Sequence, residues 1–144
     1  MNDRRKVFFD LEQDESGYPP VATESLWAIP TEDFLEYVLD NIPFFERVAT
    51  IGDRIRVEEV AGRIWYRATI GRTDHSLIRI VGLDDKDPIS MGMELEQMGC
   101  SWELDAAHHL IAVDVPREVL DRAQILLAQH ATSGEIDYEE AILR

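Results

Sequence analysis

The stretch 54–71 has the sequence RIRVEEVAGRIWYRATIG and carries the clearest structural signal in the chain. Ala61-Gly62 divides it into two halves, and glycine allows the tight turn that joins two antiparallel strands. Apolar and polar residues alternate in each half, and the apolar set is Ile55, Val57, Ile64, Tyr66, Ala68 and Ile70. This alternation predicts a β-hairpin with one face turned toward a core.

Segments before the hairpin also favour short strands. Apolar residues alternate over 7–11, a turn-rich stretch follows, and residues 23–29 give a second strand that Pro30 ends. Pro43 interrupts the apolar stretch 34–45, which argues against a long helix there. We therefore expect residues 1–75 to form an all-β lobe, a small curved sheet or partial barrel.

The pattern changes after residue 75. A β-branched strand is expected at 77–81, and Asp87-Pro88 predicts an N-cap followed by proline at the first position of a helix that Gly99 ends. Two further strands are expected at 102–104 and 110–115.

Pro116 begins the strongest predicted helix, and Ser133-Gly134 ends it. One stripe at helical spacing contains Val119, Leu120, Ala123, Leu126, Leu127 and His130. A last strand is expected at 136–143. The order strand, helix, strand, strand, helix, strand predicts a ferredoxin-like α+β lobe over residues 76–144, packed with the first lobe in one compact two-lobed protein.

Composition and charge limit the classes of function. Twenty-nine acidic and fourteen basic residues give the chain of 144 residues a net charge of −15. Such a surface repels membranes and most nucleic acid and favours a basic protein partner, although solubility alone also explains acidic proteins. No secretory or membrane-spanning segment is found, and the single cysteine, Cys100, forms no internal disulfide, so we expect a cytoplasmic location.

Several separated segments carry a family resemblance: Glu24-Ser25-Leu26-Trp27-Ala28, Leu39-Asp40-Asn41-Ile42-Pro43-Phe44-Phe45, Gly52-Asp53, His75-Ser76, Gly99-Cys100 and Tyr138-Glu139-Glu140-Ala141. In this order they resemble the bacterial family known as domain of unknown function 4265, over about residues 7–143. The resemblance implies no activity, cofactor or catalytic residue.

No catalytic constellation is expected from the reactive side chains. His75 lies between Asp74 and Ser76, but neighbours on a strand point to opposite sides and form no triad. Cys100 follows a predicted helix end, where the helix dipole disfavours a thiolate. Loop bonding by His75 and a structural role for Cys100 are the simpler interpretations, and we predict no enzyme activity.

No metal or cofactor is expected either. His108 and His109 are adjacent in sequence, whereas two histidines that share an ion usually stand two or four residues apart. The stretch Asp84-Asp85-Lys86-Asp87 lacks the glycine and later glutamate of a calcium loop. A hairpin turn and a strand-to-helix turn explain the two stretches.

One basic region stands out in the acidic chain. Between residues 47 and 79 there are seven arginines and four acidic residues. Arginines interleaved with an aromatic side chain are typical of phosphate and base-stacking sites, and nearby Glu58 and Glu59 favour a self-neutralised face instead. The candidate ligand-binding residues are Arg54, Arg56, Arg63, Trp65, Arg67 and His75.

The acidic residues of the second lobe offer a different surface. Its candidate partner-binding residues are Asp114, Glu118, Asp121, Trp102, Asp137, Tyr138, Glu139 and Glu140. We expect a non-enzymatic protein-binding module, in its most concrete form an acidic immunity or inhibitor protein that neutralises a basic partner such as a toxin. The alternative is a regulator or adaptor that binds a nucleotide or RNA through the arginine-rich hairpin. The oligomeric state and the identity of the partner stay open.

Overall fold

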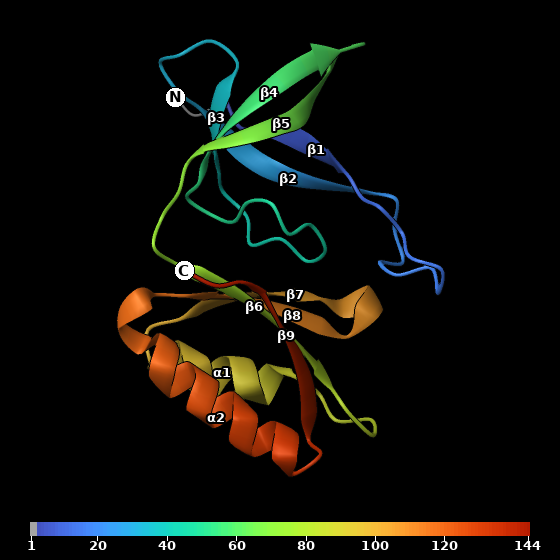
Figure 1. Ribbon diagram of the computed structural model, residues 1–144, viewed down its shortest axis with the longest axis vertical. Coiled ribbons are helices and arrows are strands. Elements are labelled where there is room, and N and C mark those ends of the chain that lie inside the picture. The colour runs from blue at the N-terminus through green and yellow to red at the C-terminus, as the bar shows by residue number, and fades with distance from the viewer. Residues whose placement is uncertain (1–2) are drawn as a thin grey trace. The chain divides into compact units, whose positions relative to one another are not determined.

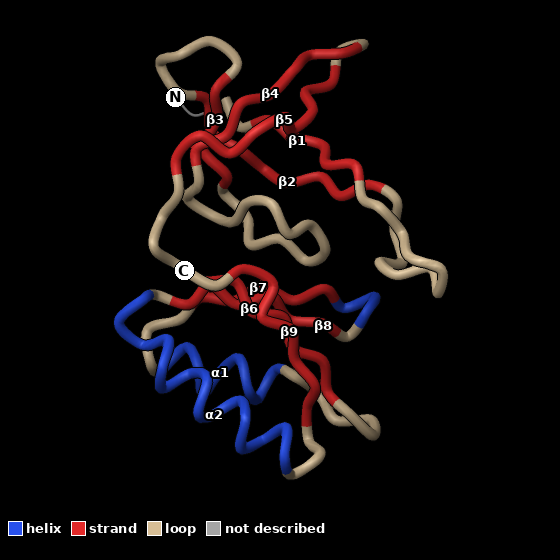
Figure 2. Tube along the Cα trace, in the orientation of Figure 1, coloured by secondary structure: helices blue, strands red, loops and turns tan. Residues whose placement is uncertain are grey.

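The computed structural model describes residues 3–144 and divides the chain into two compact units, Met1–Thr73 and Asp74–Arg144 (Figure 1). The N-terminal unit is built from strands, and Figure 2 shows helical segments only in the second unit of the described chain. The strands of the first unit are β1 (Arg5–Asp10), β2 (Thr23–Pro30), β3 (Glu36–Leu39), β4 (Arg54–Val60) and β5 (Arg63–Gly71).

These five strands form a closed barrel in the order β1-β2-β3-β4-β5. Successive strands pair antiparallel, and β1 closes the barrel by pairing in parallel with β5, where Phe8 lies opposite Trp65. The sequence predicted a curved sheet or a partial barrel. The pairing of β1 with β5 joins segments more than fifty residues apart in sequence. The alternation within each strand is local, so it could not predict that the barrel closes.

The barrel interior follows from the period of two along each strand. Buried apolar side chains of all five strands point inward and pack with Ala49 of the β3–β4 loop in one cluster: Val7, Phe9, Leu26, Ala28, Tyr37, Leu39, Ala49, Ile55, Val57 and Ile64. Tyr66 stacks on Phe9 with ring centroids 4.9 Å apart and completes this cluster from β5. The intervening residues of the same strands therefore face outward.

The second unit contains four strands and two α-helices. Its elements are β6 (Ser76–Gly82), α1 (Ile89–Gln97), β7 (Ser101–Asp105), η1 (Ala106–His108), β8 (Leu110–Val115), η2 (Arg117–Val119), α2 (Leu120–Thr132) and β9 (Ile136–Ile142). The sheet is antiparallel with the order β7-β8-β6-β9. The protein is thus a mixed α+β structure with two separate sheets.

Both helices cover the same face of this sheet (Figure 1). Their buried side chains join those of β6, β8, η2 and the start of β9, together with Cys100 before β7, in one core: Ile78, Ile80, Met91, Leu95, Cys100, Ile111, Val113, Val115, Val119, Ala123, Leu127 and Ile136. Ala123 and Leu127 lie on the stripe that the sequence predicted for the second helix. The helical layer therefore has an inner apolar face and an outer face.

The starts of both helices differ in detail from the prediction. Pro88, not Asp87, occupies the N-cap of α1, while Oδ1 of Asp87 accepts a hydrogen bond from the N–H of Ile89 at 2.8 Å. The chain after Pro116 first makes the 3₁₀ turn η2, and α2 begins at Leu120. Both corrections move a boundary by a few residues and leave the elements in place.

Within residues 3–144, no helix is long and apolar enough to cross a membrane.

Candidate functional site

Three neighbouring barrel strands bring aromatic and basic side chains together on the outer surface. β1 lies between β2 and β5, and the register places Lys6 opposite Trp27 and Phe8 opposite Trp65. These residues alternate with the buried interior positions of their strands. We call this surface the cation–aromatic face and define it by Arg4, Lys6, Phe8, Trp27, Arg63 and Trp65.

Cations lie over rings on this face. The ammonium of Lys6 is 4.7 Å and the guanidinium of Arg4 is 4.9 Å from the ring centroid of Trp27. The guanidinium of Arg63 lies 4.8 Å from the ring of Phe8, whose centroid is 5.5 Å from that of Trp65. Each contact is within the range of an attractive cation–π or aromatic interaction. Of the hairpin residues predicted from the sequence, Arg63 and Trp65 belong to this face.

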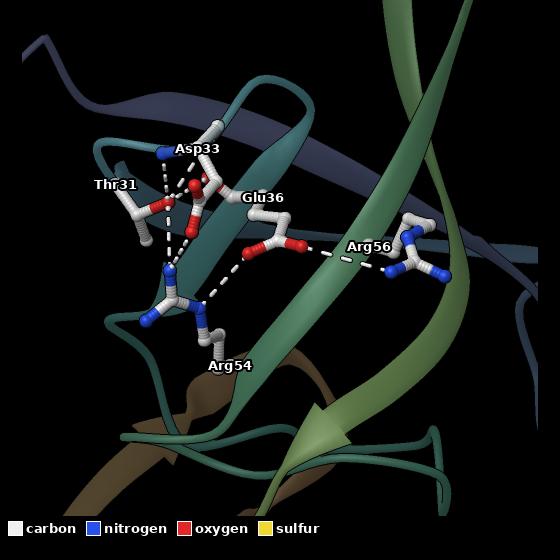
Figure 3. A network of polar contacts seen from close by, with 5 residues as sticks. All are labelled: Thr31, Asp33, Glu36, Arg54 and Arg56. Carbon is white, nitrogen blue, oxygen red and sulfur yellow. Dashed lines mark hydrogen bonds and ion pairs between the residues drawn. The ribbon is translucent and has the colours of Figure 1, made fainter.

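Arg54 and Arg56 lie in a different network (Figure 3). Arg54 donates from Nε to Glu36 at 3.0 Å and from Nη2 to Asp33 at 2.7 Å. Arg56 contacts the other carboxylate oxygen of Glu36 at 3.6 Å. These two arginines therefore lie against carboxylates of their own barrel, Glu36 and Asp33, which the sequence analysis did not name as their partners.

The remaining two hairpin candidates also separate from the cation–aromatic face. Nη2 of Arg67 donates to Glu58 at 2.6 Å, which pairs its charge across β4 and β5. His75 belongs to the C-terminal unit, where Nδ1 lies 2.8 Å from Oδ2 of Asp114.

Five of the predicted acidic-surface residues are engaged within the C-terminal unit. Asp114 is 8% exposed and contacts His75. Glu139 accepts from the buried Arg79 at 3.0 Å, and Glu140 accepts from Gln124. Trp102 and Tyr138 pack against the core beneath the helices. Strand alternation explains this placement, because it turns both aromatic rings toward the helical side of the sheet.

The other acidic residues of that set stay exposed, and two of them flank the start of α2. Glu118 lies in η2 and Asp121 in the first turn of α2, and both are exposed, as is Asp137 on β9. Two large apolar side chains on the helices are also exposed: Met93 of α1 at 58% and Ile125 of α2 at 61%. We define the helical face by Met93, Glu118, Asp121 and Ile125.

Comparison with known proteins places the chain in a family. The model of the family described as Domain of unknown function (DUF4265) matches residues 24–138. The chain belongs to this family. Its fold is similar to the crystal structure of a hypothetical protein from Neisseria gonorrhoeae, with a TM-score of 0.80 and 19% identity, covering 99% of this chain and 96% of that chain. No curated protein matches the sequence.

Two residues of the DUF4265 segments, Glu24 and Asn41, form hydrogen bonds that fix the loop between β3 and β4. Oε2 of Glu24 accepts the N–H of Phe44 at 2.7 Å, and Oε1 accepts those of Phe45 and Glu46 at 3.1 and 2.8 Å. Oδ1 of Asn41 accepts the N–H of Trp27 at 2.7 Å. One buried carboxylate therefore fixes three successive backbone donors of a segment without regular structure.

Two further buried carboxylates, those of Glu46 and Asp53, also accept hydrogen bonds from backbone N–H groups of the loop between β3 and β4. Oε1 of Glu46 accepts the N–H groups of Val48 and Ala49, both at 3.2 Å. Asp53, fully buried, accepts from the N–H groups of Thr50 and Thr73 at 2.9 and 3.1 Å. The sequence analysis did not single out these acids. Glu24 and Asp53 lie within the family segments named above, whereas Glu46 directly follows one of them.

The reactive side chains of the second unit cluster near one end of its sheet. His75 directly precedes β6, Asp114 lies near the end of β8 and Cys100 precedes β7. Burial, followed by the charge of Asp114, raises the pKa of the Cys100 thiol to about 11. The thiol is protonated at neutral pH and is a poor nucleophile there.

The predicted turns around the other histidines and aspartates have local partners. His109 adopts a left-handed conformation with φ of 53°, and Nδ1 of His108 lies 2.7 Å from Asp105. Asp84 and Asp85 also have positive φ values in the turn before α1. Among residues 3–144, no cluster of three or more histidine, cysteine or acidic side chains has an arrangement suited to a metal ion.

Sequence reasoning missed four of the six residues of the cation–aromatic face. Lys6, Phe8 and Trp27 lie on β1 and β2, and Arg4 directly precedes β1, far from the hairpin in sequence. The available signal was the outward phase of β1, in which basic and aromatic residues occupy alternate positions. This alternation indicates a shared surface only once β1 is known to lie between β2 and β5.

Proposed function

We propose that this protein is a non-enzymatic binding module that docks a basic protein partner on the helical face of its C-terminal unit. In its most concrete form it is an immunity or inhibitor protein, and the partner is a basic toxin. The observation that carries the proposal is the exposure of two large apolar side chains, Met93 of α1 and Ile125 of α2, on the helices of a strongly acidic unit.

The negative charge of the chain is concentrated in this unit. Residues 74–144 contain fifteen acidic and five basic side chains, a net charge of −10, whereas residues 1–73 contain fourteen and nine, a net charge of −5. An acidic surface accelerates encounter with a basic partner and selects against acidic ones. The charge gradient along the chain thus favours the second unit as the docking unit.

The helical face also supplies short-range contacts. Protein interfaces derive most of their affinity from a few apolar or aromatic groups that become fully buried, while the polar rim sets orientation and rate. Met93 and Ile125 provide apolar area, and Glu118 and Asp121 provide the charged rim. Trp102 and Tyr138 are less suitable anchors because they already pack against the core of the unit.

Affinity capture from the native host tests the proposal. The tagged full chain is expected to retain a stoichiometric basic protein, identified by mass spectrometry. Reversing two charges, Glu118→Lys with Asp121→Lys, is expected to lower the recovery of that partner at least about tenfold, since charge pairs at interfaces contribute strongly when desolvated.

A matched charge reversal in the other unit controls for the loss of net charge. Glu12→Lys with Glu15→Lys changes two exposed acids of the N-terminal unit by the same amount. Recovery of the partner is expected to fall only slightly in this variant. Equal losses in both double variants, or capture of nothing above background by the wild-type chain, would contradict docking on the helical face.

Two finer assignments accompany this proposal. The split βαβ, or ferredoxin-like, class suits the C-terminal unit, supported by its element order, its strand order β7-β8-β6-β9 and its two helices on one sheet face. A cytoplasmic location suits a chain with one free cysteine. Fractionation of the host, with the protein followed by immunoblot, tests the location.

A further inference from the structure

We propose that the cation–aromatic face of the barrel binds single-stranded nucleic acid. Unpaired bases would stack on Trp27 and on the Phe8–Trp65 pair, and phosphates would contact Lys6 and Arg63. This inference concerns the N-terminal unit and does not depend on the helical face, so either proposal can fail without the other.

The aromatic groups form two platforms on one surface. Trp27 is on β2 and Trp65 on β5, and both strands flank β1. Since adjacent strands are about 4.8 Å apart, the two tryptophans stand on strands about 10 Å apart. Trp27 is 36% exposed, and Phe8 and Trp65 are half-buried. Lys6 and Arg4 lie over the Trp27 ring and Arg63 over the Phe8 ring, so a base that stacks there would displace a cation from the ring toward its own phosphate. Stacking on such platforms is how proteins bind single strands without reading their sequence.

The charges on this surface are suited to phosphate. Lys6 and Arg63 rest on ring faces, whereas Arg54, Arg56 and Arg67 lie against carboxylates. A guanidinium stacked on a ring keeps its N–H donors at the ring edge, where they can reach a phosphate. Arg4 is less free, because Nε also contacts Asp40 at 3.2 Å.

The surrounding charge limits the size of the ligand. The protein carries a net charge of −15, which opposes a long polyanion. A short single strand places few phosphates on the molecule and presents its bases for stacking, whereas the bases of a duplex are already stacked on each other. The combination of two aromatic platforms and two ring-bound cations therefore favours a single strand of a few nucleotides.

Fluorescence anisotropy of a labelled oligonucleotide tests the inference directly. The full chain is titrated into a fluorescein-labelled twelve-nucleotide oligouridine at several salt concentrations. Unlabelled oligouridine, a duplex of equal length and polyglutamate serve as competitors. We expect the labelled strand to bind, and we expect unlabelled oligouridine to displace it while the duplex and polyglutamate do not.

Two variants of the face separate stacking from charge. Trp65→Ala is expected to weaken binding about fivefold or more, since one base–aromatic stack contributes on the order of fivefold to 150-fold. Lys6→Gln with Arg63→Gln is expected to reduce the slope of log affinity against log salt by about 1.4, because each phosphate contact on a single strand contributes about 0.7.

The matched control removes two charges elsewhere on the same unit. Arg56→Gln with Arg72→Gln gives the same net charge, and both side chains are exposed. Circular dichroism confirms that every variant is folded. The inference would be overturned if the two double variants weaken binding equally or if Trp65→Ala has no effect. It would also be overturned if polyglutamate competes as effectively as oligouridine, or if no binding is seen at micromolar protein.

Discussion

The carboxylate of Glu24 on β2 accepts a hydrogen bond from the N–H of Phe44 at 2.7 Å, across twenty residues of sequence. The same side chain also binds the N–H groups of Phe45 and Glu46, so a single buried acid holds the first part of the β3–β4 loop. Because these donors would otherwise be buried without acceptors, the loop depends on this carboxylate.

Glu24→Gln is expected to destabilise the barrel by about 2–3 kcal/mol, because an amide keeps one acceptor oxygen and turns an N–H donor toward the backbone donors. Urea unfolding followed by tryptophan fluorescence measures the loss. Glu58→Gln changes an acid whose side chain is 58% exposed and is expected to cost less than about 0.5 kcal/mol. A loss for Glu24→Gln no larger than this control would contradict the assigned role.

Gly92 of α1 faces the indole of Trp102 at very short range. A methyl group at this position would lie 2.8 Å from Cδ2 of Trp102 and 3.2 Å from Cδ1 of Ile111. Gly92→Ala is therefore expected to destabilise the C-terminal unit by about 1–2 kcal/mol, even though alanine gains about 1 kcal/mol of helix propensity over glycine.

Thermal unfolding of Gly92→Ala beside Ser90→Ala measures this effect. Ser90 is exposed on the same helix, so its replacement is expected to leave the stability unchanged or slightly raised. Displacement of Trp102 would also disturb the hydrogen bond that its Nε1 donates to Glu96 at 3.0 Å and shift its fluorescence. A more stable Gly92→Ala protein would show that the helix moves to accommodate the methyl group.

Cys100 is expected to react slowly with thiol reagents in the native protein. Burial raises the pKa of its thiol to about 11, so the thiolate is a minor species at pH 8. With an unfolded cysteine near pKa 8.5, the thiolate fraction at pH 8 falls on the order of 100-fold on folding, before any effect of access. Ellman's reagent, applied to native and urea-unfolded protein, measures both rates. Equal rates would contradict the buried, protonated thiol.

Glu135 provides a prediction about acid stability. The hydrogen bond with His130, at 2.6 Å, and to a smaller extent the charges of His130 and Lys86, lower the pKa of its carboxyl group. A lowered folded-state pKa stabilises the protein above the unfolded-state value of about 4.3, and this contribution disappears as the pH falls through the folded-state pKa.

The variant Glu135→Gln is therefore expected to be less stable than the wild type at pH 6, with the difference shrinking toward pH 3. Urea titrations at the two pH values give this comparison. Glu118→Gln, an exposed acid at the start of α2, serves as the control and should change little at either pH. A stability difference that grows as the pH falls would contradict a lowered pKa of Glu135 in the folded protein.

Elements with a strong local pattern could be predicted from the sequence. The hairpin of β4 and β5 follows from alternation around Ala61-Gly62, and α2 follows from apolar residues at helical spacing. Such patterns record which side of an element faces a core, and that information is local.

Pairings between distant segments could not be predicted in the same way. The parallel contact of Phe8 with Trp65 closes the barrel and creates the cation–aromatic face, yet neither residue carries a signal for the other. Asp114 and Trp102 looked suitable for a partner surface by residue type alone. Their positions within the sheet, which are set by long-range packing, direct them instead to His75 and to the helices.

The central proposal is tested most directly by calorimetric measurement of the affinity of the captured partner for the wild-type chain and for two matched side-chain variants. Ile125→Ala and Leu143→Ala each shorten an exposed apolar side chain of the same unit, one on the helical face and one after β9. The account predicts that Ile125→Ala lowers affinity at least about fivefold, or about 1 kcal/mol, while Leu143→Ala leaves it unchanged. Unchanged affinity for Ile125→Ala, or an equal loss in both, would contradict docking on the helical face.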